Sequence, residues 1–154
     1  MASWREVEAA APEFAAGVKA LFDAHKHKTM ATLRKDGSPR ISGIECNFDA
    51  GELWLGMMPD SLKAADVLRD PRVAIHSASD DSDGTSSWPG DAKLAGRLVE
   101  VTDEAEMHRM GGQPGHLFRV DINEVSMTHL GDPADHLLIE AWSPSRGLRR
   151  IKRL

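Results

Sequence analysis

Short runs of alternating apolar and polar residues, joined by tight turns, constrain this chain more than any other feature of its sequence. Lys28–Leu33 is followed by the turn Lys35-Asp36-Gly37-Ser38, and Arg40–Phe48 is followed by Asp49-Ala50-Gly51 and then by Glu52–Met57. In such turns a glycine supplies the positive φ that other residues avoid. Alternation with period two between short turns predicts an antiparallel meander of three strands.

The same pattern continues to the C-terminal region. Four further runs read as strands: Arg72–Ser77, Ala92–Val101, His116–Thr128 and Leu137–Trp142. Between the first two of them lies Ser79–Asp91, a polar and turn-rich segment that we expect to be a loop, with Trp88 as its one aromatic residue.

The sixth predicted strand contains an irregularity. Phe118, Val120 and Ile122 share one parity, whereas Val125 and Met127 share the other. Because a slip of one residue turns every following side chain to the other face, we predict a β-bulge near Asn123-Glu124.

Helices are few and short. Pro12 suits a first helical turn, and the apolar residues after it fall at the spacing of one buried helical face, which predicts a helix over about residues 12–25. Ser61–Arg69 and Asp103–Met110 read as two shorter helices. The chain has neither a βαβ rhythm nor a G-x-G-x-x-G motif, so we predict a mainly β protein, an antiparallel barrel of six to seven strands with short flanking helices.

Length and charge limit the number of domains and the classes of partner. With 154 residues and no linker, we expect one domain over 1–154, with the barrel over about 28–143 and a basic C-terminal tail over 144–154. The formal net charge of -5 argues against nucleic acid or an anionic membrane as a partner. Cys46 is the only cysteine, and the N-terminus is charged where a secretory signal would be apolar, so we expect a soluble, cytoplasmic protein.

A candidate phosphate site follows the third predicted strand. The segment Met57-Met58-Pro59-Asp60-Ser61-Leu62-Lys63 takes the chain from a strand into the start of a helix, where unpaired N–H groups and the helix dipole favour an anion. Ser61 offers a hydroxyl and Lys63 a positive charge. The alternative is that Asp60 or Ser61 only caps the helix and that Lys63 is a solvated surface residue.

The stretch from Thr29 to His76 resembles the pyridoxamine 5'-phosphate oxidase-like split-barrel family. Its fragments "ATLRKDGSP", "LW" and "SLKAADVLRDPRV" stand in the order and spacing that are typical of that family, and the likeness extends over about Lys28–Val101. The resemblance implies a split barrel and a homodimer with a phosphorylated flavin or deazaflavin, FMN or coenzyme F420, at the dimer interface.

The resemblance also implies which residues would bind the cofactor. Ser61 and Lys63 match the family's phosphate-binding positions, and the strand over Arg40, Ile41, Ser42, Gly43 and Ile44 matches the one that lies along the edge of the ring. The remaining matches are Met57 and Met58 below the ring and ribityl chain, Trp88 towards the cofactor of the neighbouring subunit, and Trp142 with Arg146 near the ring. Glu45 stands where relatives often carry a neutral residue, so we expect it to face the cofactor, the subunit interface or a Lys or Arg partner.

Two functions are compatible with this resemblance. The first is an oxidoreductase that uses FMN or F420 to transfer hydride or electrons to a small oxidised substrate; the cofactor supplies the chemistry, so the sequence identifies no catalytic residue. The alternative is a non-catalytic flavin- or haem-binding protein on the same fold. The seven histidines lack a metal-ligand spacing, so no metal site is predicted.

Overall fold

The computed structural model describes residues 1–81 and 88–154, so the central part of the predicted loop Ser79–Asp91 lies outside the described residues. The strands of this part are β1 (Lys28–Leu33), β2 (Pro39–Ile44), β3 (Cys46–Asp49), β4 (Glu52–Met57), β5 (Arg72–His76), β6 (Asp91–Val101), β7 (His116–Leu130), β8 (Leu137–Ser143) and β9 (Gly147–Arg153). The helices are α1 (Trp4–Ala10), α2 (Pro12–Asp23), α3 (Leu62–Arg69) and α4 (Glu104–Arg109). None of these helices is both long and apolar enough to cross a bilayer.

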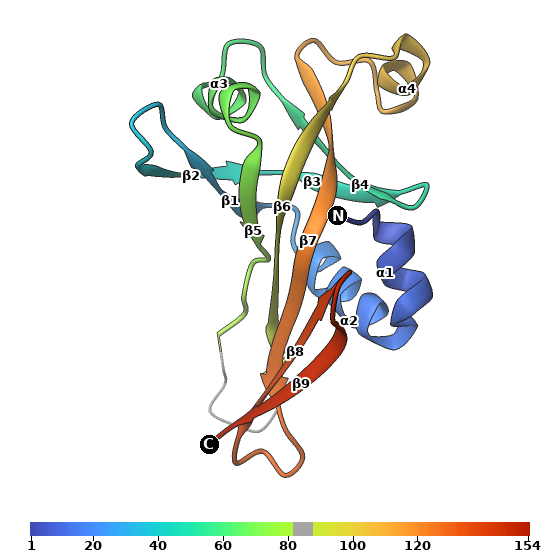
Figure 1. Ribbon diagram of the computed structural model, residues 1–154, viewed down its shortest axis with the longest axis vertical. Coiled ribbons are helices and arrows are strands. Elements are labelled where there is room, and N and C mark those ends of the chain that lie inside the picture. The colour runs from blue at the N-terminus through green and yellow to red at the C-terminus, as the bar shows by residue number, and fades with distance from the viewer. Residues whose placement is uncertain (82–87) are drawn as a thin grey trace.

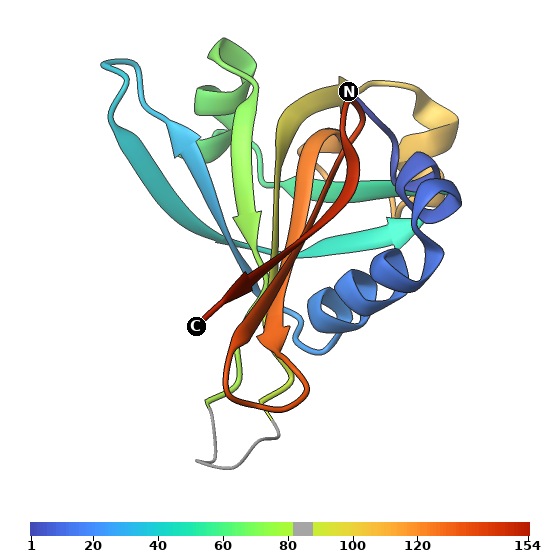
Figure 2. The same ribbon diagram turned by 60° about the horizontal axis from the view of Figure 1, so that its bottom comes forward.

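The strands form a single antiparallel sheet that curls into a split barrel (Figures 1 and 2). Hydrogen-bonded neighbours follow the order β2-β1-β5-β6-β7-β4-β3. The two ends of this path, β2 and β3, are consecutive in the chain and only Glu45 separates them. One stretch of chain therefore pairs with β1 through its first half and with β4 through its second half, which closes the barrel.

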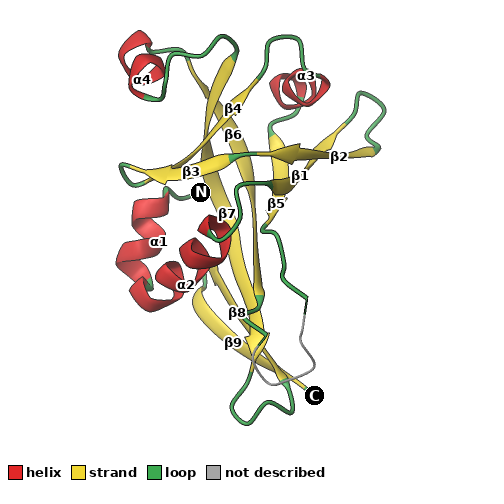
Figure 3. Cartoon of the chain, turned by 180° about the vertical axis from the view of Figure 1, so that it is seen from behind, coloured by secondary structure: helices red, strands yellow, loops and turns green. Residues whose placement is uncertain are grey.

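Strand β7 is long enough to serve two partners. Its first residues pair with β4, from Trp54↔Arg119 to Met57↔His116, and its last residues pair with β8, from Val125↔Trp142 onward. Strands β8 and β9 then extend as a hairpin to the end of the molecule opposite α3 and α4 (Figures 1 and 3).

The predicted β-bulge in β7 is confirmed. Ala95 of β6 pairs with Glu124 whereas Gly96 pairs with Ile122, so Asn123 is the extra residue. The slip lets Phe118, Val120 and Ile122 before it and Val125 after it all point into the core, where each is at most 1% exposed.

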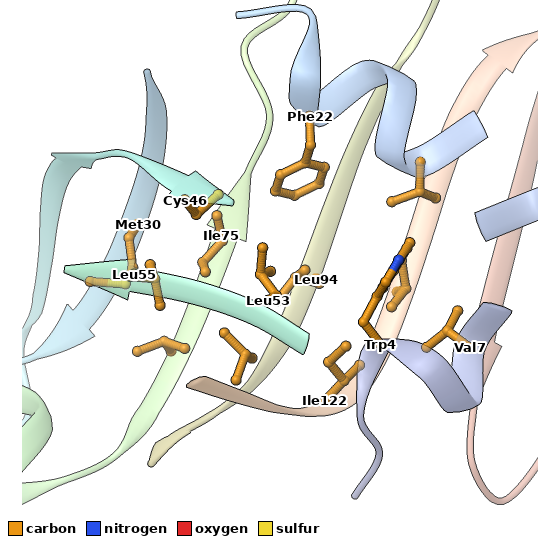
Figure 4. Packing of buried hydrophobic residues seen from close by; sticks show 14 of the residues in the cluster. Trp4, Val7, Phe22, Met30, Cys46, Leu53, Leu55, Ile75, Leu94 and Ile122 are labelled. Carbon is orange, nitrogen blue, oxygen red and sulfur yellow. The ribbon is translucent and has the colours of Figure 1, made fainter. Parts of the chain in front are cut away.

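The two N-terminal helices cover the barrel core from one side (Figure 4). Helix α2 buries Phe14, Val18 and Phe22, as its apolar spacing predicts. The ring of Trp4 from α1 lies 4.5 Å from that of Phe48 on β3. Burial of these large side chains removes enough apolar surface from water to fix the helices against the strands.

The structure differs from the sequence-based expectation at both ends of the chain. Helix α1 was not predicted, although Ser3 and Glu6 form a complete capping box at its start. The segment over 144–154 is not a separate tail, because β9 pairs with β8 over its whole length. Backbone pairing with β8, the packing of Leu148 against the core and the bond of Arg150 to Glu140 at 2.8 Å hold β9 in place. The described residues therefore contain nine strands rather than six or seven.

Gly96 lies opposite the bulge, and its substitution tests how closely the two strands pack there. A Cβ at this position would lie 2.2 Å from the backbone oxygen of Asp121, which cannot move without disturbing the sheet. We expect Gly96→Ala to lower the free energy of unfolding in urea by about 1–3 kcal/mol. Gly43→Ala in β2 is the matched control, since its Cβ would meet nothing within 4 Å, and an equal loss in both variants would contradict this packing.

Candidate functional site

A groove of about 510 Å³ lies at the end of the barrel that carries α3 and α4. It runs between the start of α3, the β2–β3 corner and β4. Its lining side chains and backbone come from His27, Gly43, Ile44, Glu45, Asn47, Trp54, Leu55, Gly56, Met57, Met58, Lys63, Met110, Gln113 and Leu117. The volume is that of a typical small-molecule site.

Lys63 places a positive charge in this groove. Its Nζ donates a hydrogen bond to the carbonyl oxygen of Gly43, at 3.0 Å. No carboxylate within the described ranges lies within ion-pair distance of it. An ammonium group has three donors, so two remain for an anionic ligand.

Ser61 begins α3, two residues before Lys63. Its Oγ accepts a hydrogen bond from the N–H of Ala64 at 3.2 Å, so the residue caps the helix as the alternative interpretation predicted. The hydroxyl hydrogen is still able to donate. The N–H groups of Leu62 and Lys63 stand in the first turn, which has no intrahelical acceptors, so this helix start remains suited to an anion.

Asp66 fixes the orientation of α3 relative to the barrel. Its carboxylate, 3% exposed, accepts hydrogen bonds from Thr32 Oγ1 on β1 at 2.7 Å, from Arg40 Nε on β2 at 2.7 Å and from Arg69 at 3.2 Å. Burial raises the pKa of Asp66, but the hydrogen bonds from Arg40, Thr32 and Arg69 outweigh it and leave the pKa below its usual value. The carboxylate therefore stays charged and holds the helix that presents Lys63.

Glu45 lies at the corner between β2 and β3 and lines the groove. Its carboxylate lies 3.5 Å from Lys26 Nζ and 3.5 Å from His27 Nε2. Of the alternatives for this residue, a lysine partner, Lys26, is therefore present. Because all three side chains are more than half exposed, these pairs contribute little to stability, yet they offset a negative charge beside the groove.

Gly43, Ile44, Met57, Met58 and Lys63 are the sequence-predicted residues that the structure brings together in the groove. Met57 is buried beneath it, whereas Met58 is 76% exposed at its rim. A Cβ at Gly43 would meet no atom within 4 Å, so the bare backbone leaves room for a flat ring to approach.

The other predicted site residues lie elsewhere in the isolated chain. The side chain of Arg40 turns inward to Asp66, and Ser42, two residues along β2, lies on the same face of the strand. Ile41 points to the outer face of the sheet. Trp88 lies near the end of α2, with its indole N–H bonded to the carbonyl oxygen of Asp80 at 3.0 Å. Trp142 is packed in the core at 4% exposure, and Arg146 lies in the turn between β8 and β9. Their contacts to a cofactor stay predictions.

The outer face of the sheet carries a second hollow, of about 420 Å³, beside the groove. Small residues form its floor, with Ala31 opposite Ala74 and Ala74 opposite Ala95. Ile41, 74% exposed, stands at its edge, two residues along β2 from Gly43. Because Ile41 and Gly43 share one parity, the hollow and the groove open onto the same side of the barrel.

Several groove residues were not predicted from the sequence. Trp54 and Asn47 come from the β3–β4 hairpin, and Gln113 comes from the segment after α4. The family-typical "LW" fragment includes Trp54, but it did not predict that the indole lines the groove. No other sequence signal pointed to these residues. Among the described residues, no group of three His, Cys, Asp or Glu side chains is placed to hold a metal ion.

Comparison with known proteins supports the fold and shows the family. Residues 14–129 match the family model of pyridoxamine 5'-phosphate oxidase. No functionally curated protein matches the sequence significantly. Solved structures are similar in fold at low identity, including a conserved hypothetical protein from Mycobacterium tuberculosis (TM-score 0.58, 20% identity, covering 71% of this chain and 81% of that one).

Two other similar structures have names that describe a bound group. One is an F420 reductase, with a TM-score of 0.53 and 17% identity over 71% of this chain and 95% of that one. The other is HutZ, the haem storage protein from Vibrio cholerae, with a TM-score of 0.54 and 16% identity over 74% of this chain and 90% of that one. At these identities the likeness establishes the fold alone.

Removal of the Asp66 carboxylate should destabilise the protein strongly. Asp66→Ala leaves the guanidinium of Arg40, whose side chain is 22% exposed, without its partner, so we expect a loss of about 3 kcal/mol or more in urea unfolding. The pKa of Asp66 is lower in the folded state than in the unfolded state. The stabilisation by its carboxylate is therefore fully present above the unfolded-state pKa of Asp66 and is lost as pH falls through the folded-state pKa. Asp66→Asn should therefore weaken the dependence of stability on acidic pH; an unchanged dependence would contradict the assignment.

Proposed function

This chain belongs to the pyridoxamine 5'-phosphate oxidase family, and we propose that it is an oxidoreductase that binds FMN or coenzyme F420 in the groove beside α3. The observation that supports this proposal most directly is the ammonium of Lys63, which lies at the groove bonded to a backbone carbonyl and keeps donors free for a phosphate. Both cofactors carry a phosphate. When bound, either one supplies hydride or electron transfer to a small oxidised substrate.

The residues of this chain would bind and orient the cofactor. Lys63 and the first turn of α3 hold the phosphate, and the hydroxyl of Ser61 adds a donor. The backbone at Gly43 lets the ring edge approach β2, and Met57 forms an apolar floor that excludes water. The Asp66 hydrogen bonds keep Lys63 in place.

We further propose that the site is completed by a second copy of the chain. The groove opens beside the apolar hollow of Ala31, Ala74 and Ala95, and the exposed Ile41 stands next to both. A twofold contact over this face would cover these side chains and place the hollow of one copy over the groove of the other. We expect such a homodimer to bury well over ~1,000 Å².

The absorbance spectrum of the purified protein separates the candidate ligands. Bands of an oxidised flavin would identify FMN, and a colourless protein that binds added F420 would identify the deazaflavin. A Soret band would instead support the alternative, a haem-binding protein. Turnover of the reduced cofactor with an added acceptor would distinguish an enzyme from a carrier.

Substitution of Lys63 tests phosphate binding. We expect Lys63→Ala to weaken FMN binding by about 1.5–3 kcal/mol, because a charged hydrogen bond is lost, and to leave the weak binding of riboflavin unchanged. Fluorescence titration measures both. Lys152→Ala on β9, remote from the groove, is the matched control and should bind FMN as the wild type does. Equal affinity of the wild type for FMN and riboflavin would contradict the assignment; for F420, its phosphate-free precursor is the comparison.

Substitution of Ala74 tests the dimer. Ala74→Arg places a charge at the centre of the outer-face hollow, so light scattering should detect monomers at micromolar concentration and cofactor affinity should fall in parallel. Ala9→Arg adds the same charge on an exposed position of α1 and should remain dimeric. A wild-type protein that is monomeric at that concentration would overturn the proposal.

A further inference from the structure

A smaller hollow of about 210 Å³ opens from the groove towards α4. We call it the methionine pocket, because Met57, Met58, Met107 and Met110 line it together with His116. The hollow and the groove adjoin, because they share Gly56, Met57, Met58, Met110, Gln113 and Leu117. A molecule in this pocket would lie directly beside a cofactor in the groove.

Four of the seven methionines of the chain gather in this pocket. Met57 belongs to the buried core, but Met58 is 76% exposed and α4, which carries Met107, buries none of its side chains. Methionine is flexible and polarisable and adapts to apolar and aromatic surfaces. Apart from His116, the lining consists of glycine, methionine, glutamine, proline and leucine, so it presents no fixed charge.

Arg109 and Glu106 of α4 are paired with each other, and neither lines the pocket. Arg109 forms ion pairs with Asp49 on the β3–β4 hairpin and with Glu106, and its guanidinium lies 5.5 Å from the centre of the Trp54 ring. These contacts hold α4 against the hairpin, so that Met107 and Met110 remain over the hollow. The helix thus contributes apolar side chains to the pocket and keeps its charges at the rim.

His116 supplies the one ionisable group in the lining. Its Nδ1 lies 2.8 Å from Glu100 Oε1, and its ring stacks near that of Phe118. A carboxylate on one ring nitrogen fixes the tautomer and the ring orientation. Among the described residues no partner occupies Nε2, which leaves this nitrogen for the polar atom of a ligand. An anionic ligand at Nε2 would also lie close to the like charge of the Glu100 carboxylate.

We infer that the methionine pocket is the substrate subsite and that it selects a small, uncharged, flat electron acceptor, whose ring packs on the methionines and whose polar edge faces His116. That the ligand accepts electrons rests on the proposed function. That it is small, uncharged and flat follows from the residues that line the pocket. Transfer of an unpaired charge into such a lining is costly, whereas an apolar ring gains dispersion contacts there.

Methyl NMR of protein labelled with ¹³C at the methionine methyl groups tests the inference without any cofactor. The probes are nitrobenzene and 4-nitrobenzenesulfonate, which differ by a single charged group. We expect nitrobenzene to shift the methyl signals of Met57, Met58, Met107 and Met110 in a saturable manner, and to leave the signal of the core residue Met30 unchanged. The sulfonate should bind about tenfold more weakly or worse.

Two matched variants locate the selectivity. Met107→Lys places a cation in the pocket and should reverse the preference between the two probes, whereas His108→Lys adds the same charge at an exposed position of α4 outside the lining and should preserve it. Equal binding of both probes, or shifts confined to other methionines, would overturn the inference. Because no cofactor is present, failure of FMN and F420 to bind at Lys63 would reject the proposed function and leave this result intact.

Discussion

The structure depends on one stretch of chain that changes partner halfway along its length. Residues 39–49 pair with β1 before Glu45 and with β4 after it, and this change closes the sheet into a barrel. The corner also opens the groove, because Gly43 on one side and Asn47 on the other turn away from the core at that point. Fold closure and the site therefore have a common origin in the geometry of this strand.

A balance of charges distinguishes the groove from the rest of the surface. The chain carries a net negative charge, yet Lys63 reaches the groove unpaired by a carboxylate within the described residues, and Glu45 is offset by Lys26. Asp66, which could neutralise a ligand-binding cation, instead lies beneath α3 and pairs with Arg40. The arrangement concentrates positive potential where an anionic group would enter.

The sequence predicts the periodic parts of this fold well. The alternation of the early strands, the apolar face of α2 and the bulge at Asn123 all follow from side-chain parity, because burial imposes it directly. Strand β9 could not be predicted in this way, because it lacks an alternating apolar face. Its arginines, Arg149 and Arg150, instead form ion pairs with Glu124 and Glu140. In α3 the apolar spacing misleads, because Leu62, Ala65 and Leu68 share a face that is exposed, whereas Ala64 and Val67 are buried.

The site was predictable to a smaller extent, because it depends on long-range contacts. Lys63 was found from the start of its helix and Gly43 through the family resemblance, but no local pattern reveals that Lys63 Nζ lies 3.0 Å from the carbonyl oxygen of Gly43. The methionine pocket is similar, since Met57 and Met107 stand on elements that meet only when α4 folds against the β3–β4 hairpin. Trp142 was matched to a cofactor position through the resemblance. In the structure its side chain is packed in the core of its own chain.

Phosphorus NMR of the protein loaded with FMN or F420 tests the central claim, that the ammonium of Lys63 binds the cofactor phosphate, most directly. The account predicts that the phosphorus signal of the bound cofactor is displaced from its free position in the wild type and returns most of the way in Lys63→Gln, measured at saturation in both proteins. A bound signal at the same position in both proteins would contradict it, because the phosphate would then lie away from α3.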